Sequence, residues 1–315
     1  MTRFITILTF STLPCYNRCI YATPRGGIYK MKKIGQILKE IRIEKNIKIS
    51  NVCNNVMDRG NYWRFENGII STSSENLLII LENLNIDIME FIELYSTEDL
   101  TEFKTLQNNL LKGAKTDNHR ICNEIGELAK TKYNSNKKIK YLHLSEQAFL
   151  FASRIESNIT GTISTYIPTE THKYLGQCDT WNYYEITLFN NILFTFCLAD
   201  AVTLGNRLIL SLKNKQKTRN ISNEDVLILV NLISFCIEED ASTAAKKLVK
   251  ELLTFNISES AAYSKILFLW IKTIFEIKFE QGNVQDLDKI FNTLVLLDMP
   301  DTSVMLQNWT KKLLK

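Results

Sequence analysis

The segment MDRGNYWRFENG, residues 57–68, places two arginines, three aromatic residues and two asparagines in one short stretch. Arginine suits guanine edges and phosphates, and asparagine suits adenine edges and phosphates, so these side chains could bind DNA. Aromatic side chains are usually buried instead. A helix with one face in a protein core and the other in a DNA groove accounts for both kinds of residue. The alternative for the arginines is an ordinary solvated helix face.

We assign the residues of this segment to the two faces of such a helix. Tyr62 and Phe65 face the core, Gly68 ends the helix, and Trp63 has no assigned place. Tyr62 is a candidate for both faces, because it is also counted among the DNA contacts. The residues of the segment that we predict to contact DNA are Arg59, Asn61, Tyr62 and Arg64.

The elements that must position this helix are short and amphipathic. Apolar residues recur at helical spacing in five segments, at 33–46, 49–56, 59–67, 71–85 and 86–95. Five such helices in about 65 residues have the size and rhythm of a helix-turn-helix domain of the phage-repressor type, whose third helix reads DNA. The apolar positions that this spacing turns toward the core include Ile34, Leu38, Ile41, Val52, Cys53, Ile80, Leu81, Leu84, Ile88, Phe91, Ile92 and Tyr95.

Charge is unevenly distributed along the chain, whose formal net charge is +4. Residues 31–68 hold eight basic and four acidic residues, whereas residues 69–99 hold seven acidic residues and no basic ones. A basic block that ends at the candidate DNA-reading segment suggests a polyanionic partner for that block alone.

Longer helical segments follow residue 100. Helix pairs begin near 181, 222 and 259, and this spacing of about 40 residues fits helical-hairpin repeats. Stacked hairpins form a superhelix with a concave inner face. We therefore predict an all-α chain with one domain at 31–97 and a helical-repeat domain at 98–315. The helices that we predict in the second domain span 101–115, 118–133, 137–157, 169–176, 181–197, 199–214, 222–238, 240–254, 259–281, 284–298 and 301–314.

Two stretches resemble the Rgg/GadR/MutR family of transcription regulators. The first runs from IGQILKEIRIEKNIKI through MDRGNYWRFENG to MEFIELY, and the second is TWNYYEITLFNNILFTF at 180–196. The resemblance covers the chain from Met31 to the C-terminus. It implies a five-helix repressor-like domain that binds double-stranded DNA, followed by a tetratricopeptide-like (TPR-like) regulatory domain. The second domain would bind a short signalling peptide and form a homodimer.

The resemblance also implies roles for single residues. Arg42 and Glu66 match a pair that holds the recognition helix in this type of domain. The family's second helix commonly opens with serine and glutamine, where this chain has Lys48 and isoleucine. The glutamine contact is therefore in doubt, and Lys48 becomes a candidate phosphate contact. Asp58 can cap the third helix, although Gly60 lowers its intrinsic stability by up to about 1 kcal/mol.

Several polar residues of the repeats could bind a peptide. An asparagine amide can both donate to and accept from an extended backbone, and an arginine can bind a carboxylate. The alternative for the aromatic residues among them is the core of the repeats. The candidates are Arg154, Trp181, Tyr184, Asn190, Asn191, Arg207 and Asn231, and Phe189, Phe194 and Phe235 could line an apolar groove.

The sequence shows no catalytic or metal-binding pattern. It has no glycine-rich phosphate loop and no nucleophile elbow, and its histidines, at 119, 143 and 172, lack the spacing of metal ligands. Its seven cysteines are an odd number without paired spacing, which is typical of reduced thiols in a cytoplasm. We therefore expect no enzymatic activity, no cofactor and no metal. No window is long and apolar enough to predict a membrane span.

Residues 1–30 are expected to be a translated leader or a disordered extension. Arg25, Gly26 and Gly27 can be encoded by a purine-rich ribosome-binding sequence, and three residues then separate them from Met31, the expected natural start.

The sequence as a whole predicts a cytoplasmic, sequence-specific DNA-binding transcription regulator. We expect a short signalling peptide to control it, in quorum sensing or in bacteriocin gene control. The alternative is a helical-repeat scaffold that binds proteins and has no sequence-specific affinity for DNA.

Overall fold

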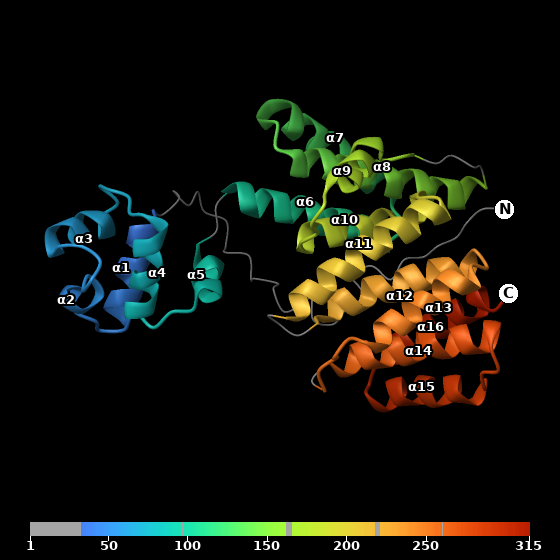
Figure 1. The fold of residues 1–315 in the computed structure, drawn as a ribbon. Coiled ribbons are helices and arrows are strands. Elements are labelled where there is room, and N and C mark those ends of the chain that lie inside the picture. Colours follow the sequence, from blue (N-terminus) through green and yellow to red (C-terminus); the bar gives the residue numbers. More distant parts are fainter. Residues whose placement is uncertain (1–32, 96–97, 162–165, 218–220, 260) are drawn as a thin grey trace. The chain divides into compact units, whose positions relative to one another are not determined.

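The computed structural model of the chain describes residues 33–95, 98–161, 166–217, 221–259 and 261–315. These residues form helices and no β-strand (Figure 1), which confirms the predicted all-α fold. They divide into two compact units, with the division between Asn108 and Asn109. The segment 1–30, expected to be a leader or an extension, lies outside the described residues.

Five helices lie wholly within the N-terminal unit, which also includes the helical residues 98–108. They are α1 (Ile34–Glu44), α2 (Ile49–Val52), α3 (Arg59–Glu66), α4 (Ser74–Asn83) and α5 (Ile88–Leu94). Helix α2 ends before the predicted limit at residue 56, because Asn55 adopts a φ of 59°. Asparagine enters this left-handed region more readily than most residues do. Helix α3 is bounded as predicted, since the Asp58 carboxylate caps its first turn and Gly68, with a φ of 67°, follows its end.

The core of this unit contains most of the apolar positions that helical spacing selects. Its fully buried members are Leu38, Val52, Tyr62, Ile80 and Leu84. The prediction is wrong for Ile88 and Ile92, which are 44% and 46% exposed. Helix α5 is short and packs on α4 through one side, so only Phe91 of its apolar residues is fully enclosed.

The second unit is built from longer helices. They are α6 (Glu98–Lys115), α7 (His119–Asn136), α8 (Ile139–Thr160), α9 (Thr169–Gln177), α10 (Tyr183–Ile192), α11 (Leu198–Gln216), α12 (Asn223–Glu238), α13 (Ser242–Leu253), α14 (Ala262–Phe279), α15 (Gln285–Leu296) and α16 (Pro300–Leu313). Each predicted helix is present, with ends shifted by a few residues. The segment 181–197 is the exception, because α10 gives way to a 3₁₀ turn, η3 (Leu193–Thr195), before the chain extends at Phe196.

Side-chain hydrogen bonds join equivalent positions of successive repeats in this unit. His143 and Tyr184 are 41 residues apart in sequence, and their Nδ1 and OH atoms are 2.8 Å apart. Asn231 Nδ2 donates to Asn190 Oδ1 at 2.7 Å across the same separation. Further along, the indole of Trp270 donates to a threonine 40 residues later. The predicted repeat of about 40 residues is therefore confirmed, with α10 packed between α8 and α12, and α12 packed on α14 (Figure 1).

Candidate functional site

Helix α3 is held at its C-terminal end by an ion pair with α1. Arg42 Nε lies 2.5 Å from Glu66 Oε1, and Arg42 Nη2 donates to the other carboxylate oxygen at 3.0 Å. Glu66 is 1% exposed, and its hydrogen bond raises the pKa of Arg42. The third guanidinium nitrogen donates to the carbonyl of Ile47 at 3.0 Å. One arginine thus fixes both α3 and the loop that leads into α2.

Three further contacts between α1 and the end of α3 were not expected from the sequence. A Cβ atom on Gly35 would lie 1.9 Å from the Phe65 carbonyl oxygen, so the two backbones approach too closely for any other residue. Lys33 Nζ donates to the Gly68 carbonyl at 2.5 Å, and Lys39 Nζ donates to Asn67 Oδ1 at 2.8 Å. One feature of the sequence could have predicted the Gly35 contact, namely a glycine on the apolar face of an amphipathic helix. Glycine destabilises a helix interior, so its presence there indicates that another backbone comes close.

The remaining part of α3 presents polar side chains to solvent. Arg59 and Arg64 are exposed, and so is Lys48, just before α2. Asn61 is partly exposed, and its Nδ2 atom donates to Asp58 Oδ2 at 2.5 Å. The Asn61 amide nitrogen is thus held by the cap residue, and its oxygen accepts no hydrogen bond from that residue.

Tyr62 does not belong to this exposed set. Its side chain is 0% exposed, and burial raises the pKa of its phenol. Its assignment to the core is confirmed. Its assignment as a DNA contact is wrong, because a fully enclosed side chain cannot reach a base or a phosphate.

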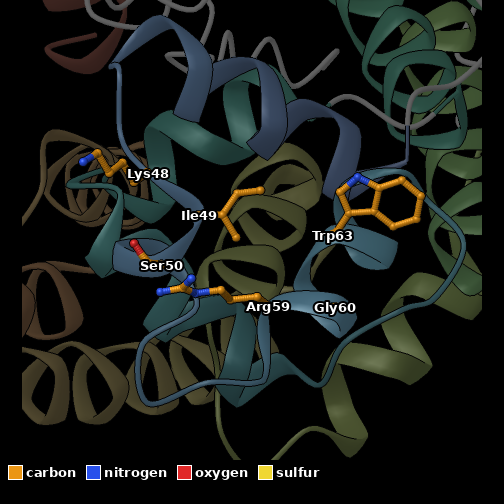
Figure 2. A pocket seen from close by; sticks show the side chains of 6 residues that line it. All are labelled: Lys48, Ile49, Ser50, Arg59, Gly60 and Trp63. Carbon is orange, nitrogen blue, oxygen red and sulfur yellow. The ribbon is translucent and has the colours of Figure 1, made fainter.

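An open pocket of about 550 Å³ lies between the start of α2 and the start of α3. It is lined by Lys48, Ile49, Ser50, Arg59, Gly60 and Trp63 (Figure 2). Trp63, which had no predicted place, is 53% exposed and forms one side of this pocket. In Figure 2 its ring lies on the side opposite Lys48 and the guanidinium of Arg59.

The aromatic residues predicted to line a peptide groove lie mostly in the core of the repeats. Trp181 is 1% exposed and its ring centroid is 5.1 Å from that of Phe189, which is itself fully buried, as is Phe235. The prediction of Trp181 as a groove residue is therefore wrong. Tyr184 is partly exposed, but its hydroxyl is bound to His143.

The predicted asparagines lie between neighbouring helices rather than in open solvent. Asn190 on α10 accepts from Asn231 on α12, and both are buried. The Nδ2 atom of Asn190 has no hydrogen-bond partner among the described residues. Asn191 Nδ2 donates to Gln147 Oε1 on α8 at 2.8 Å. These amides line the seam that joins α8, α10 and α12.

The two candidate arginines of the repeats differ in their surroundings. Arg207 donates to backbone carbonyls at the end of α9, including that of Gly176 at 2.7 Å, and therefore has a structural role. Arg154 on α8 lies over the ring of Phe194, with Cζ 4.3 Å from the centroid. The structure's described part gives its guanidinium no hydrogen bond and no ion pair. Burial lowers the pKa of Arg154 to about 10, so it still carries its charge at neutral pH.

The sequence of the second unit matches a known family. Residues 123–307, more than half of the chain, match the C-terminal domain of the HTH-type transcriptional regulator Rgg. The chain belongs to the Rgg family. The matched region of this Rgg chain contains Arg154 and the Asn190–Asn231 pair.

Solved structures show the same fold along nearly the whole Rgg chain. The SHP pheromone receptor Rgg2 of Streptococcus dysgalactiae is 21% identical, with a TM-score of 0.69 over 89% of this chain and 99% of that one. A putative transcriptional regulator from Listeria monocytogenes EGD-e is 16% identical, with a TM-score of 0.73 over 90% and 98%. PrgX in its complex with cCF10 is also 16% identical, with a TM-score of 0.69 over 90% and 92%.

The described part of this Rgg chain contains neither a membrane-spanning helix nor a metal-binding group. None of its described helices is long and apolar enough to cross a membrane. Its described histidine, cysteine and acidic side chains form no group that could hold a metal ion.

Proposed function

We propose that this chain binds a specific DNA operator through α3 and regulates transcription there. The observation that supports the proposal is a set of exposed cations on one unit: Arg59 and Arg64 on α3, whose far end is anchored to α1, and Lys48 just before α2. Arginine and lysine supply phosphate contacts, and arginine also reads guanine. The chain would act in the cytoplasm as a homodimer, with two α3 helices in successive major grooves about 34–36 Å apart.

A mobility-shift titration against the chromosomal region beside the gene tests this proposal. We expect Arg59→Ala and Arg64→Ala to weaken binding. The loss should be about 1–3 kcal/mol if the arginine contacts a base. If it contacts a phosphate, the slope of log affinity against log salt concentration should become smaller by about 1. The matched control is Arg120→Ala, which removes an exposed arginine on α7 and should leave affinity unchanged. Unchanged affinity and salt slope in both α3 variants would show that α3 does not bind DNA.

We further propose that a short peptide bound to the repeats controls DNA binding. One structure of similar fold is described as a bacterial peptide pheromone and receptor complex. In this chain, Arg154 offers a desolvated cation that has no ion pair among the described residues, although Glu238 and Asp117 lie near enough to favour its charged form. A peptide with a free carboxylate would pair with this guanidinium.

Fluorescence polarisation can test the role of Arg154. The probe is a labelled synthetic peptide with the sequence of a small open reading frame beside the gene, made with a free or an amidated C-terminus. We expect Arg154→Ala to weaken binding of the free acid about tenfold or more, since a hydrogen bond to a charged group contributes about 1.5–3 kcal/mol. Amidation should cause the same loss in the wild type and no further loss in the variant. Equal binding of both peptides would exclude a carboxylate contact at Arg154.

A protein-interaction scaffold is the alternative function. The scaffold would bind no DNA specifically, and its N-terminal unit would contact a protein. Sequence-independent binding with the same affinity for every duplex, unchanged in both α3 variants, would favour it.

A further inference from the structure

Trp63 is an exposed aromatic residue in a chain that buries its other tryptophans. Its side chain is 53% exposed, whereas Trp181, Trp270 and Trp309 are 1%, 0% and 5% exposed. All four tryptophans of the sequence lie in the described residues. Tryptophan contributes a large apolar surface when it becomes buried at an interface. A ring left in solvent on the outward side of the recognition helix therefore suggests a partner that covers it.

The pocket beside Trp63 combines an apolar interior with a cationic rim. Ile49 and Trp63 provide the apolar side chains, and Lys48 and Arg59 provide the positive charges (Figure 2). Gly60 places no side chain there, and a Cβ atom at this position would meet only the Asp58 carboxylate, at 3.2 Å. The pocket is thus open and apolar, and it is flanked by groups that attract phosphates.

The major groove of DNA identifies an occupant for such a pocket. Base edges there carry hydrogen-bond donors and acceptors, and their one apolar group is the C5-methyl of thymine. Arg59 and Lys48 on the rim would meet the backbone or a neighbouring guanine. A peptide or protein partner would also need apolar groups, but the cationic rim favours the polyanion.

We infer that Trp63 and Ile49 bind the C5-methyl group of a thymine in each operator half-site. This inference rests on the proposed function, because it requires α3 to lie in the major groove. Within that function, it assigns sequence discrimination to a residue pair that makes no hydrogen bond to a base. Arg59 and Lys48 would then supply affinity, and the apolar pair would distinguish thymine from the other bases.

Replacing thymine with deoxyuridine tests the inference, since the two differ only by the methyl group. The probe is a duplex selected from random sequence by the wild-type protein, with each thymine of the footprint replaced in turn. We expect one or two replacements per half-site to weaken wild-type binding about fourfold, the effect of removing one buried methyl group. Trp63→Ala should bind the thymine and deoxyuridine duplexes equally. The control Leu78→Ala, which removes an exposed leucine of α4, should keep the wild-type difference.

The outcomes separate this inference from the proposed function. If the wild type selects no duplex, α3 does not bind DNA specifically and the proposed function is wrong. If it binds a selected duplex but tolerates every deoxyuridine, or if Trp63→Ala keeps the fourfold difference, only the thymine contact is wrong. A Trp63→Ala variant that weakens all duplexes equally, with a changed salt slope, would instead indicate a backbone contact and would also overturn the inference.

Discussion

At the scale of single side chains, the Arg42–Glu66 pair is expected to be the most sensitive interaction of the N-terminal unit. Its side chains are only 14% and 1% exposed, so removing one partner leaves a buried charge. We expect Arg42→Ala to lower the free energy of unfolding by about 3 kcal/mol or more, measured by urea denaturation. The Lys246–Glu280 pair, 53% and 39% exposed, is the control. Lys246→Ala should cost less than about 1 kcal/mol, and an equal loss in both variants would contradict the argument.

A second residue-scale prediction concerns His143, which is buried against Tyr174, Tyr184 and Glu185. Burial lowers the pKa of His143 to about 4, although nearby Glu185 opposes the shift. Between pH 6.5 and 4 the unfolded chain therefore binds a proton that the folded chain does not. Stability should fall as the pH drops through this window, with a contribution of up to about 1.4 kcal/mol per pH unit.

The His143 contribution can be isolated by comparing two pH profiles. His143→Gln should flatten the unfolding free energy between pH 6.5 and 4 relative to the wild type. The partly buried His172 titrates in both proteins, so it cancels in the difference. Parallel profiles would mean that His143 is protonated in the folded protein.

At the scale of helices, the close approach of α1 to α3 is expected to tolerate no side chain at Gly35. In Gly35→Ala the new Cβ would collide with a backbone carbonyl of α3. We expect the N-terminal unit to lose about 2 kcal/mol or more, as measured by urea denaturation. Gly60→Ala is the matched control, because its Cβ would meet only a side-chain oxygen of Asp58, at 3.2 Å, which can shift slightly, and alanine favours a helix by about 1 kcal/mol. Comparable destabilisation of both variants would exclude a specific contact at Gly35.

Helices were easier to predict from the sequence than the direction in which single side chains point. Apolar spacing locates every helix, because a 3.6-residue period needs only local sequence. The same spacing does not reveal how much of a helix its neighbours cover, which is why Ile92 is exposed and Trp181 is buried. The Arg42–Glu66 pair was predicted from matching positions in the family that the sequence resembles. The buried glycine at position 35 indicates that some backbone approaches α1 closely, but local sequence does not identify α3, about 30 residues later, as that partner.

At the scale of the whole molecule, the two units are expected to unfold separately. Each has a core of its own, and the division falls between Asn108 and Asn109. Trp63 reports on the N-terminal unit, and the buried tryptophans report on the repeats. We expect two denaturation transitions, one for each unit, and the fluorescence of Trp63→Phe should follow only the transition of the repeats. A saturating operator duplex at about 100 times its Kd should raise the free energy of unfolding of the N-terminal unit alone, by about 2.7 kcal/mol. One coincident transition for all probes would contradict this prediction.

The contacts between α1 and the C-terminal end of α3 bear on how new binding specificities can arise. Its anchors to α1 are at Glu66, Asn67 and Gly68, after the last outward arginine. The positions that face outward come earlier, between Arg59 and Arg64. Since the anchors and the outward positions occupy different parts of one helix, outward residues can be exchanged without weakening the contacts with α1. Under the proposed function, these outward residues are the ones that read DNA. A chimaera with the outward residues of another regulator should therefore fold normally and prefer the donor's operator.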